Sequence, residues 1–229
     1  MGFCQAGGIA MSDKNFVMEN ELMEYADLFR KYCPPPLFVK KGTHLTRQCS
    51  TGGWLYYILD GILKTYTVNS RGNERIIDLM HENTVVGMDC LDPDTKAVVS
   101  IVCLTDAEVL PFTTDTLRRM IRENPDFGFA MVLYYGKVLR QVTYHSATLG
   151  VGSRSSRIAN FLYLYTDTET YKKTQEVRLS QEDLASACGV SLSQAARTLR
   201  KLREEGILST SSKRISVLDR EGLARHCDF

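Results

Sequence analysis

The sequence has no long hydrophobic run, and this absence excludes a membrane-spanning helix. None of the apolar stretches among the 229 residues approaches the ~18–20 residues that cross a bilayer. Residues 1–11 lack the basic start and the sustained apolar core of a secretory signal. Myristoylation is disfavoured as well, because position 6 holds Ala6 rather than Ser or Thr. We therefore expect a cytoplasmic protein that does not bind membranes.

Closely spaced cysteines are also lacking. The seven cysteines are an odd number and include no CxxC pair; they stand at positions 4, 33, 49, 90, 103, 188 and 227. This arrangement argues against a disulfide framework and against a zinc site made by neighbouring residues. It is typical of a protein kept in a reducing compartment.

Histidine is scarce, which bears on metal-dependent catalysis. The four histidines are His44, His81, His145 and His226, and no two are paired at a spacing typical of metal ligands. A jelly-roll metalloenzyme of the cupin type needs two or three histidines and a carboxylate around its metal. The sequence therefore predicts a protein that is not an enzyme, and a cupin-like metalloenzyme is a remote alternative.

Neither sign of charge prevails over the whole chain, which carries 28 Lys and Arg against 27 Asp and Glu. The distribution is uneven, however. Residues 153–229 hold 13 basic and 10 acidic side chains, whereas the preceding residues hold 15 basic and 17 acidic ones. The basic excess therefore lies at the C-terminal end.

Residues 37–112 have the composition of short β-strands. Segments rich in β-branched and aromatic residues cover 37–42, 54–59, 62–68, 75–80 and 97–104. Turn-forming residues separate them. Many short strands at regular spacing predict a sandwich, jelly roll or barrel. A short helix over about 20–31 is expected before them.

Residues 125–149 carry the longest helical pattern. Asn124 can cap this helix, and Pro125 suits its first turn. Apolar or small residues recur at heptad spacing along it: Val132, Tyr135, Leu139, Val142, Ser146 and Leu149. This stripe can pack on the chain's own β domain, or it can form the seam of a parallel homodimer.

A domain boundary is expected at 150–153, where Gly150 and Gly152 would end the long helix. Ser153 or Ser155 can cap a following helix over about 157–165. Residues 166–176 show no apolar pattern apart from Tyr171 and are predicted to form a loop.

Residues 179–208 form the most informative segment. Ser180 can cap a short helix with acidic residues in its first turn. Gly189 supplies a sharp turn, and Ser191 or Ser193 can cap a second helix that extends to about residue 205. The expected inner faces hold Leu184, Ala185, Ala187, Ala195, Leu199 and Leu202. This pattern predicts a helix-turn-helix, whose second helix can enter the major groove of DNA.

The second of these helices is basic. Between residues 191 and 203 there is no acidic side chain, but there are four basic ones: Arg197, Arg200, Lys201 and Arg203. Such a bias suits a polyanion, although surface arginines on a helical hairpin occur in many folds. Residues 207–218 then predict a two-stranded ribbon with Lys213 at or near its tip, which completes a winged helix. A winged helix that binds protein instead of DNA is the alternative.

From Lys40 onward the chain resembles the Crp/Fnr family of bacterial transcription regulators. The resemblance covers about 190 residues in the family's order. It rests on the helix-turn-helix and on five short motifs: KGT at 41–43, LYYILDG at 55–61, GNE at 72–74, NPD at 124–126 and SRI at 156–158. The family implies an α+β protein with an N-terminal double-stranded β-helix (jelly-roll) sensor domain, a long dimerisation helix and a C-terminal winged helix-turn-helix.

The resemblance divides the chain into four parts. These are an extension (1–19), a β-roll effector-sensing domain (20–123), the dimerisation helix and hinge (124–152) and the DNA-binding domain (153–229). It implies a homodimer on a two-fold operator in double-stranded DNA, with RNA polymerase as a further partner. An effector would adjust the hinge until the winged helices match successive major grooves, ~34 Å apart. Constitutive or thiol-redox-controlled binding without a ligand is the alternative.

The resemblance also implies which residues contact DNA. Ser180 matches a phosphate contact, and Ser191 matches a backbone anchor. Arg197 matches a base reader, and Arg can address guanine with two hydrogen bonds. Lys201 and Lys213 are expected to contact phosphates.

Leu192 and Ser193 match the other reading positions but depart from the family's pattern. The catabolite activator has an Arg-Glu pair there, and much of the family has the Glu. Ser193 cannot accept from cytosine as a carboxylate would, and Leu192 offers only apolar contact, while Gln194 can address adenine. We therefore expect a half-site that differs from the usual family consensus.

The sensor domain departs from the family's cyclic-nucleotide branch, which carries a Gly-Glu pair followed by an Arg-Ser pair. Here Met88 follows Gly87 in place of the carboxylate, and Val98 and Val99 replace the phosphate-binding pair. A buried phosphate without an Arg partner is costly, so we expect that cAMP is not the effector. Lys96 would reach the site only if its loop shifted.

The effector pocket is otherwise expected to be apolar and aromatic. Its expected lining is Tyr57, Tyr66, Gly87, Met88, Val98, Tyr135, Lys137, Val142 and Thr143. Such a pocket suits a small aromatic or organic acid, anchored by Lys137 or a tyrosine hydroxyl. The alternative is that the tyrosines are ordinary core and rim residues.

No cofactor is expected. Family members with an iron–sulfur cluster hold it by cysteines near the N-terminus, where only Cys4 and Cys33 lie. Haem needs an axial ligand such as His81 or Cys90, and a lone histidine at a strand end is more often a surface residue. Oxidation of Cys188 at the helix-turn-helix turn would disturb DNA docking, but a small buried turn residue is the more common case.

Overall fold

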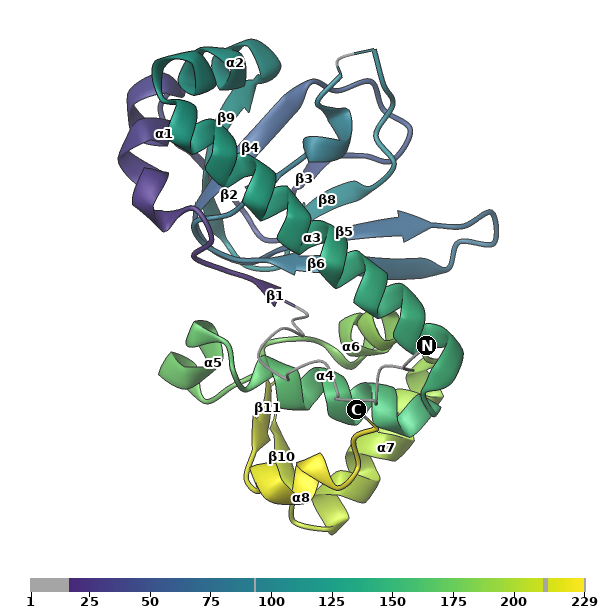
Figure 1. Cartoon of the computed structure of the whole chain (residues 1–229). Helices are drawn as coiled ribbons and strands as arrows, with labels where there is room; N and C mark the ends of the chain where they lie inside the picture. Colours follow the sequence, from purple (N-terminus) through teal and green to yellow (C-terminus); the bar gives the residue numbers. More distant parts are fainter. Residues whose placement is uncertain (1–16, 93, 212–213, 229) are drawn as a thin grey trace, which may run out of the picture. The chain divides into compact units, whose positions relative to one another are not determined.

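The computed structural model describes residues 17–92, 94–211 and 214–228 (Figure 1). The described part divides into two compact units, one over 17–140 and one from residue 141 onward. The division falls inside helix α3 (Pro125–Val151), so one helix belongs to both units. This helix continues through Gly150, which the sequence analysis expected to break it.

The first unit is built from two β-sheets. One has the strand order β1-β6-β5-β8-β3 and the other has the order β2-β9-β4-β7. All neighbouring strands are antiparallel except β1 and β6. The strands are β1 (Val17–Met18), β2 (Leu37–Val39), β3 (His44–Thr46), β4 (Trp54–Asp60), β5 (Leu63–Val68), β6 (Glu74–Met80), β7 (Val85–Val86), β8 (Ser100–Cys103) and β9 (Ala107–Thr113).

The turn between β4 and β5 shows how the sequence enforces this arrangement. Gly61 has a φ of +100°, which L side chains rarely adopt. A Cβ atom there would come within 2.8 Å of the backbone of Asp106 and Ala107. Glycine therefore allows the turn to pass directly over the start of β9.

Aromatic packing joins the helices of this unit to the sheets. Phe29 of helix α1 (Ala26–Tyr32) stacks on Tyr57 of β4, with ring centroids 4.0 Å apart, and meets Phe127 of α3 edge-on at 5.4 Å. All three rings are buried. Helix α2 (Thr114–Glu123) begins where β9 ends, and the Thr113 hydroxyl accepts from the Thr116 N–H. This helix has no counterpart among the elements expected from the sequence.

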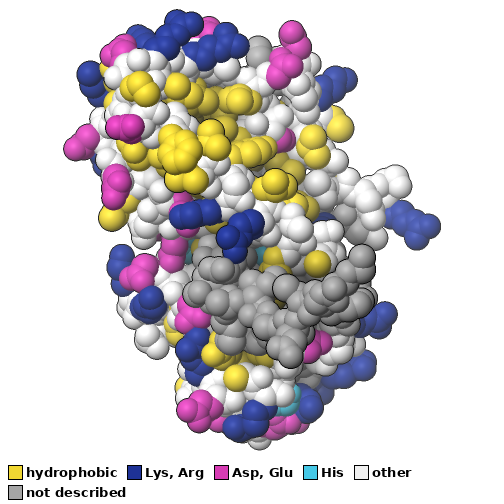
Figure 2. Space-filling view, in the orientation of Figure 1, with side chains coloured by type: hydrophobic (Ala, Val, Ile, Leu, Met, Phe, Trp, Pro, Cys, Tyr) yellow, Lys and Arg dark blue, Asp and Glu magenta, His cyan; other side chains and the backbone are white. Residues whose placement is uncertain are grey.

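Helix α3 presents different residues on two faces. Phe127, Met131 and Tyr134 are buried in the core of the first unit. Apolar side chains also gather on the surface over this helix (Figure 2), where five are about half or more exposed: Phe129, Val132, Leu133, Tyr135 and Leu139. The predicted stripe contained three of these five and missed Phe129 and Leu133. Of its remaining members, Val142 is half-buried, Ser146 is exposed and the side chain of Leu149 lies outside the described ones.

The second unit is a small helical domain with a β-ribbon. Helix α4 packs against α6, α7 and α8, and the ribbon pairs β10 with β11. Its elements beyond α3 are α4 (Arg154–Tyr165), α5 (Glu169–Thr174), α6 (Gln181–Cys188), α7 (Leu192–Glu204), β10 (Leu208–Ser211), β11 (Arg214–Val217) and α8 (Arg220–Ala224). Among the described residues, no helix is both long and apolar enough to cross a membrane.

Helix α5 corrects the sequence analysis, which predicted a loop over 166–176. The Thr168 hydroxyl caps the helix by accepting from the Tyr171 N–H at 3.1 Å. The Tyr171 ring is buried, and its hydroxyl accepts from the Val217 N–H at 2.9 Å. A helix of six residues with one buried anchor shows no apolar period, which is why the pattern missed it.

Candidate nucleic-acid interface and sensor cavity

Helix α6 begins as the sequence predicts. The Ser180 hydroxyl accepts from the Asp183 N–H at 3.0 Å and lies 2.8 Å from the Asp183 carboxylate, to which it donates. Leu184, Ala185 and Ala187 are buried on the inner face. An acidic first turn also complements the helix dipole.

The turn and the second helix follow the predicted pattern as well. Gly189 takes the left-handed conformation, with φ +59°. Ser191, not Ser193, is the N-cap of α7, because its hydroxyl accepts from the Gln194 N–H at 3.2 Å. The predicted inner residues Ala195, Leu199 and Leu202 are all buried.

A residue that the sequence analysis left without a role braces this turn. The guanidinium of Arg157, on α4, donates from one Nη1 to the carbonyl oxygens of Cys188 and Gly189, at 3.4 and 3.2 Å. These carbonyls end α6, where the helix dipole favours a cation. The Ser-Arg-Ile motif at 156–158 was the available signal, since it contains the arginine on α4 that makes these hydrogen bonds.

The outer face of α7 is exposed and positively charged. Leu192, Ser193 and all four basic residues of the helix are exposed, and Gln194 is half-buried. Lys201 lies 3.8 Å from Glu205, and Arg203 donates to the Thr210 hydroxyl at 3.3 Å. Among the described residues, none forms a hydrogen bond or ion pair with the Arg197 side chain. The residues predicted to read bases therefore share one end of an exposed helix whose flank carries further cations.

The basic residue described on the ribbon is paired, unlike Arg197 of α7. Arg214, at the start of β11, forms an ion pair with Glu176 at 3.0 Å, and Arg178 donates to the same carboxylate at 3.2 Å. The predicted phosphate contact Lys213 lies outside the described residues. Because the Glu176 carboxylate binds both arginines, it partly neutralises the positive charge on this side of the ribbon.

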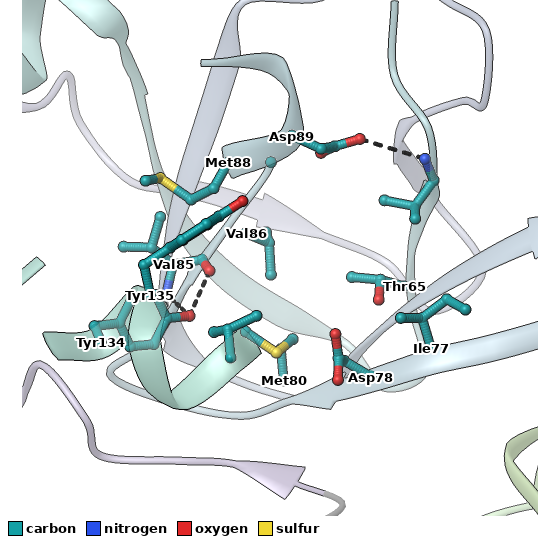
Figure 3. A pocket seen from close by; sticks show the side chains of 13 residues that line it. Thr65, Ile77, Asp78, Met80, Val85, Val86, Met88, Asp89, Tyr134 and Tyr135 are labelled. Atoms are coloured by element: carbon teal, nitrogen blue, oxygen red, sulfur yellow. Dashed lines mark hydrogen bonds between the residues drawn. The ribbon is translucent and has the colours of Figure 1, made fainter. Parts of the chain in front are cut away.

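The first unit contains a cavity of about 130 Å³ beside β6, β7 and α3 (Figure 3). Most of its lining is apolar or aromatic. The described lining residues are Thr65, Ile77, Asp78, Met80, Val85, Val86, Gly87, Met88, Asp89, Val99, Tyr134, Tyr135 and Val138. The Tyr134 hydroxyl accepts from the Val85 N–H at 3.1 Å and donates to the Val85 carbonyl at 2.6 Å, so it fixes α3 to β7.

The cavity contains three of the predicted effector residues, namely Gly87, Met88 and Tyr135. Two predicted residues belong elsewhere because their side chains have other partners. Tyr57 is fully buried in the aromatic core and donates to Asn83 at 2.7 Å, and the Tyr66 hydroxyl lies 2.7 Å from Nε2 of His44.

The remaining predicted effector residues are also outside this lining. Val98 is 60% exposed. The Lys137 ammonium forms an ion pair with the carboxylate of Glu21, which removes it as the expected anchor for an acid. Val142 and Thr143 belong to the part of α3 beyond Arg140.

His81 corrects another expectation. The imidazole is fully buried instead of lying at the surface, and burial lowers the pKa of His81 to about 3. Among the described residues, no three His, Cys, Asp or Glu side chains come together in a way that could hold a metal ion.

Apart from the exposed Cys49, the described cysteines lie where burial disfavours formation of the thiolate. Burial raises the pKa of Cys33 and Cys227 to about 12 and that of Cys103 to about 11. Cys188, at the turn of the helix-turn-helix, is also buried. Since the thiolate is the reactive form, these environments disfavour redox control through the buried thiols, Cys188 included.

Two domain families match the sequence, and together they define a class of protein. Residues 36–124 match the cyclic nucleotide-binding domain, and residues 156–226 match the Crp-like helix-turn-helix domain. A sensor-type β-roll followed by this helix-turn-helix defines a DNA-binding transcription regulator. The chain belongs to the Crp/Fnr family of regulators, as the sequence analysis expected.

Several characterised relatives are transcription regulators. The global nitrogen regulator of Nostoc sp. is 26% identical over 169 residues, which cover 71% of this chain and 76% of the relative. The transcriptional activator protein anr of Pseudomonas aeruginosa is 23% identical, with 79% and 75% covered. The cAMP-activated global transcriptional regulator CRP of Escherichia coli is 21% identical, with 82% and 91% covered.

Solved structures show the same fold. The c-di-GMP responsive global regulator CLP of Xanthomonas campestris matches with a TM-score of 0.74 at 20% identity, over 85% of this chain and 98% of that one. FixK2 of Bradyrhizobium japonicum matches with a TM-score of 0.73 at 18% identity and the same coverage. These likenesses confirm the predicted α+β architecture of jelly roll, long helix and helix-turn-helix.

Proposed function

We propose that the chain is a homodimeric regulator that binds a two-fold operator in double-stranded DNA and is gated by a small effector in the β-roll cavity. RNA polymerase is the proposed downstream partner. The observation that carries this proposal is the exposed basic outer face of α7 beside a turn fixed by Ser191, Gly189 and Arg157. A recognition helix held in this way can reach base edges from its N-terminal end.

Homodimerisation is supported by the outer face of α3. The side chains of Phe129, Val132 and Leu139 are each more than 60% exposed, which is unusual for large apolar residues grouped on one helix. The spacing of the exposed residues fits a two-helix seam, in which each apolar side chain enters a hole on the facing helix. A dimer of this kind would carry two recognition helices and explain a two-fold operator.

A nucleotide is not the proposed effector. None of the described residues that line the cavity is Lys, Arg or His, so a buried phosphate would find no cation there. This agrees with the replacement of the phosphate-binding pair by Val98 and Val99. Constitutive binding remains the alternative to an effector, and one experiment separates the two.

The experiment is the selection of genomic DNA fragments from the source organism by purified, reduced protein. It is run with and without a small-molecule extract of the same cells. Enrichment of a two-fold site only with extract supports gating, and equal enrichment in both arms supports constitutive binding. Failure to enrich any two-fold site in either arm would contradict the proposed function.

Two variants then test the division of roles along α7. Replacing the Arg197 side chain (Arg197→Ala) is expected to relax specificity at one base pair of each half-site, at a cost of about 1–3 kcal/mol. Lys201→Ala is expected to weaken binding to all sequences alike and to reduce the salt dependence of log K by about one per subunit. The exposed Lys41, in the other unit, provides a control substitution (Lys41→Ala). Equal effects of the two α7 variants on all sequences would refute the division.

A further inference from the structure

Three charged side chains meet where the ribbon joins the start of the helix-turn-helix. Val177 pairs with Ile215 of β11 through two backbone hydrogen bonds, at 2.8 and 3.1 Å, and both side chains are buried. Because side chains alternate along an extended chain, the neighbouring residues Glu176, Arg178 and Arg214 lie on the opposite, outward face. The antiparallel register sets Arg178 directly across from Arg214.

One carboxylate binds both arginines. The Nε atom of Arg178 donates to Oε2 of Glu176 at 3.2 Å, and Nη1 of Arg214 donates to Oε1 at 3.0 Å. The two arginine side chains are nevertheless 49% and 57% exposed. A guanidinium carries five N–H donors, and each of these contacts uses one of them. Each arginine therefore has further donors with which it can meet a second anion.

Folding stability alone does not explain this arrangement. Like charges directly opposite each other on neighbouring strands are destabilising. Exposed ion pairs add little to stability, and one arginine would already neutralise the Glu176 carboxylate. Two cations and one anion leave the cluster with a net charge of +1. This net charge and the exposed guanidinium groups suit an anionic partner.

The cluster lies next to parts of the domain that are expected to meet the DNA backbone. Arg178 stands two residues before Ser180, the N-cap of α6 and a predicted phosphate contact, and the first helix of a helix-turn-helix crosses the backbone. Arg214 pairs with Ser211 at the tip end of the ribbon. For a DNA-binding regulator, the anion available at this place is the phosphate of the duplex, which arginine binds with charge-assisted hydrogen bonds.

We propose that Arg178 and Arg214 form an additional contact for the backbone phosphates of DNA, and that Glu176 is a built-in competitor for the same two guanidinium groups. A phosphate bound there lies close to the Glu176 carboxylate and shares its donors. Both the repulsion and the competition lower the affinity for DNA, whatever its sequence. This inference rests on DNA binding, which the proposed function includes, but on neither the dimer nor the effector.

Duplex DNA that lacks an operator isolates this contact, because its binding depends mainly on phosphates. Affinities of the full-length protein are measured by fluorescence anisotropy between about 50 and 200 mM salt. Glu176→Gln keeps the shape of the side chain and removes its charge. It is expected to tighten binding about three- to tenfold at the lower salt concentration, and to steepen the fall of log K with log salt by up to about two per subunit. Weaker or unchanged binding would overturn the proposal, since a carboxylate needed only to hold the ribbon would cause a loss when neutralised.

A matched control removes the same charge from another ion pair of this unit. Asp167 pairs with Arg220 at 2.6 Å, and Arg220 begins α8, beyond the other end of β11. Asp167→Asn is therefore expected to change the affinity for the same DNA by less than about twofold. An increase as large as that of Glu176→Gln would show that net charge alone produces the effect, and would overturn the role of the cluster.

A double-mutant cycle tests the competition itself. Arg178→Gln and Arg214→Gln are each expected to weaken binding at least about twofold more in the Glu176→Gln background than in the wild type, because there the arginines no longer share their donors. Equal losses in the two backgrounds would refute the competition. Wild-type protein that binds no duplex DNA would contradict the proposed function and this contact together, whereas wild-type binding that Glu176→Gln does not strengthen would overturn this inference alone.

Discussion

The buried imidazole of His81 makes the stability of the N-terminal unit dependent on pH. The side chain follows β6 and is fully buried, and this burial lowers the pKa of His81 to about 3, from an ordinary value of about 6.5. One carboxylate, that of Glu19, lies beside the ring, 4.0 Å from Nδ1 of His81. The ring is therefore neutral in the folded protein at physiological pH.

The sign and size of the effect follow from linkage. The unfolded chain binds a proton at His81 near pH 6.5, whereas the folded chain does so only near pH 3. The full stability is therefore present above pH 6.5 and is lost as the pH falls from there toward 3. Between pH 8 and pH 5 this single group is expected to remove about 2 kcal/mol from the free energy of unfolding.

The only tryptophan of the chain, Trp54, reports on this unit because it lies on β4. Urea unfolding followed by its fluorescence at pH 8 and pH 5 gives the two free energies of unfolding. The loss between the two pH values is expected to be about 2 kcal/mol smaller in His81→Gln than in the wild type. His226→Gln, in the other unit, serves as the matched control and should behave as the wild type does. Equal losses in His81→Gln and the wild type would refute the reasoning, and would indicate an imidazolium stabilised by Glu19.

Two further predictions concern the brace and the seam. Arg157→Ala removes charge-assisted hydrogen bonds from the end of α6 and should destabilise the C-terminal unit by about 2 kcal/mol, measured by circular dichroism during thermal unfolding. Substitution of the exposed neighbour, Arg154→Ala, should destabilise it by less than about 0.5 kcal/mol. Equal losses of stability in the two variants would show that the hydrogen bonds of Arg157 are not needed. Val132→Glu on α3 should convert the dimer to a monomer in sedimentation velocity. Phe38→Glu, which replaces an even more exposed apolar residue on β2, should leave the dimer intact. A dimeric Val132→Glu protein would place the dimer interface elsewhere.

The helix-turn-helix was predictable nearly residue by residue, because its determinants are local. A hydroxyl cap at Ser180, a left-handed glycine at Gly189 and a second cap at Ser191 each act within four residues along the chain. The periodic burial of Leu199 and Leu202 follows from the helix itself. Such features need no knowledge of the tertiary fold.

The cavity was predicted poorly, because its lining depends on which face of each strand turns inward. Tyr57 and Tyr66 both lie on strands that the composition marked, but one joins the aromatic core and the other pairs with His44. Lys137 sits next to the lining on α3, and only the position of Glu21 shows that it is already paired. Asp78 was overlooked because an acidic residue in an alternating strand is usually exposed.

The hydroxyl of Tyr134 has one consequence beyond holding α3 in place. Strand β7 is the last strand of its sheet, and Val85 would otherwise present an open N–H and carbonyl to another chain. Open strand edges are where sheets of separate molecules join and aggregate. By satisfying both groups with a single phenol, the helix takes the place of a neighbouring strand and keeps this edge closed. Loss of this oxygen in Tyr134→Phe is therefore expected to leave both groups of Val85 open at the strand edge.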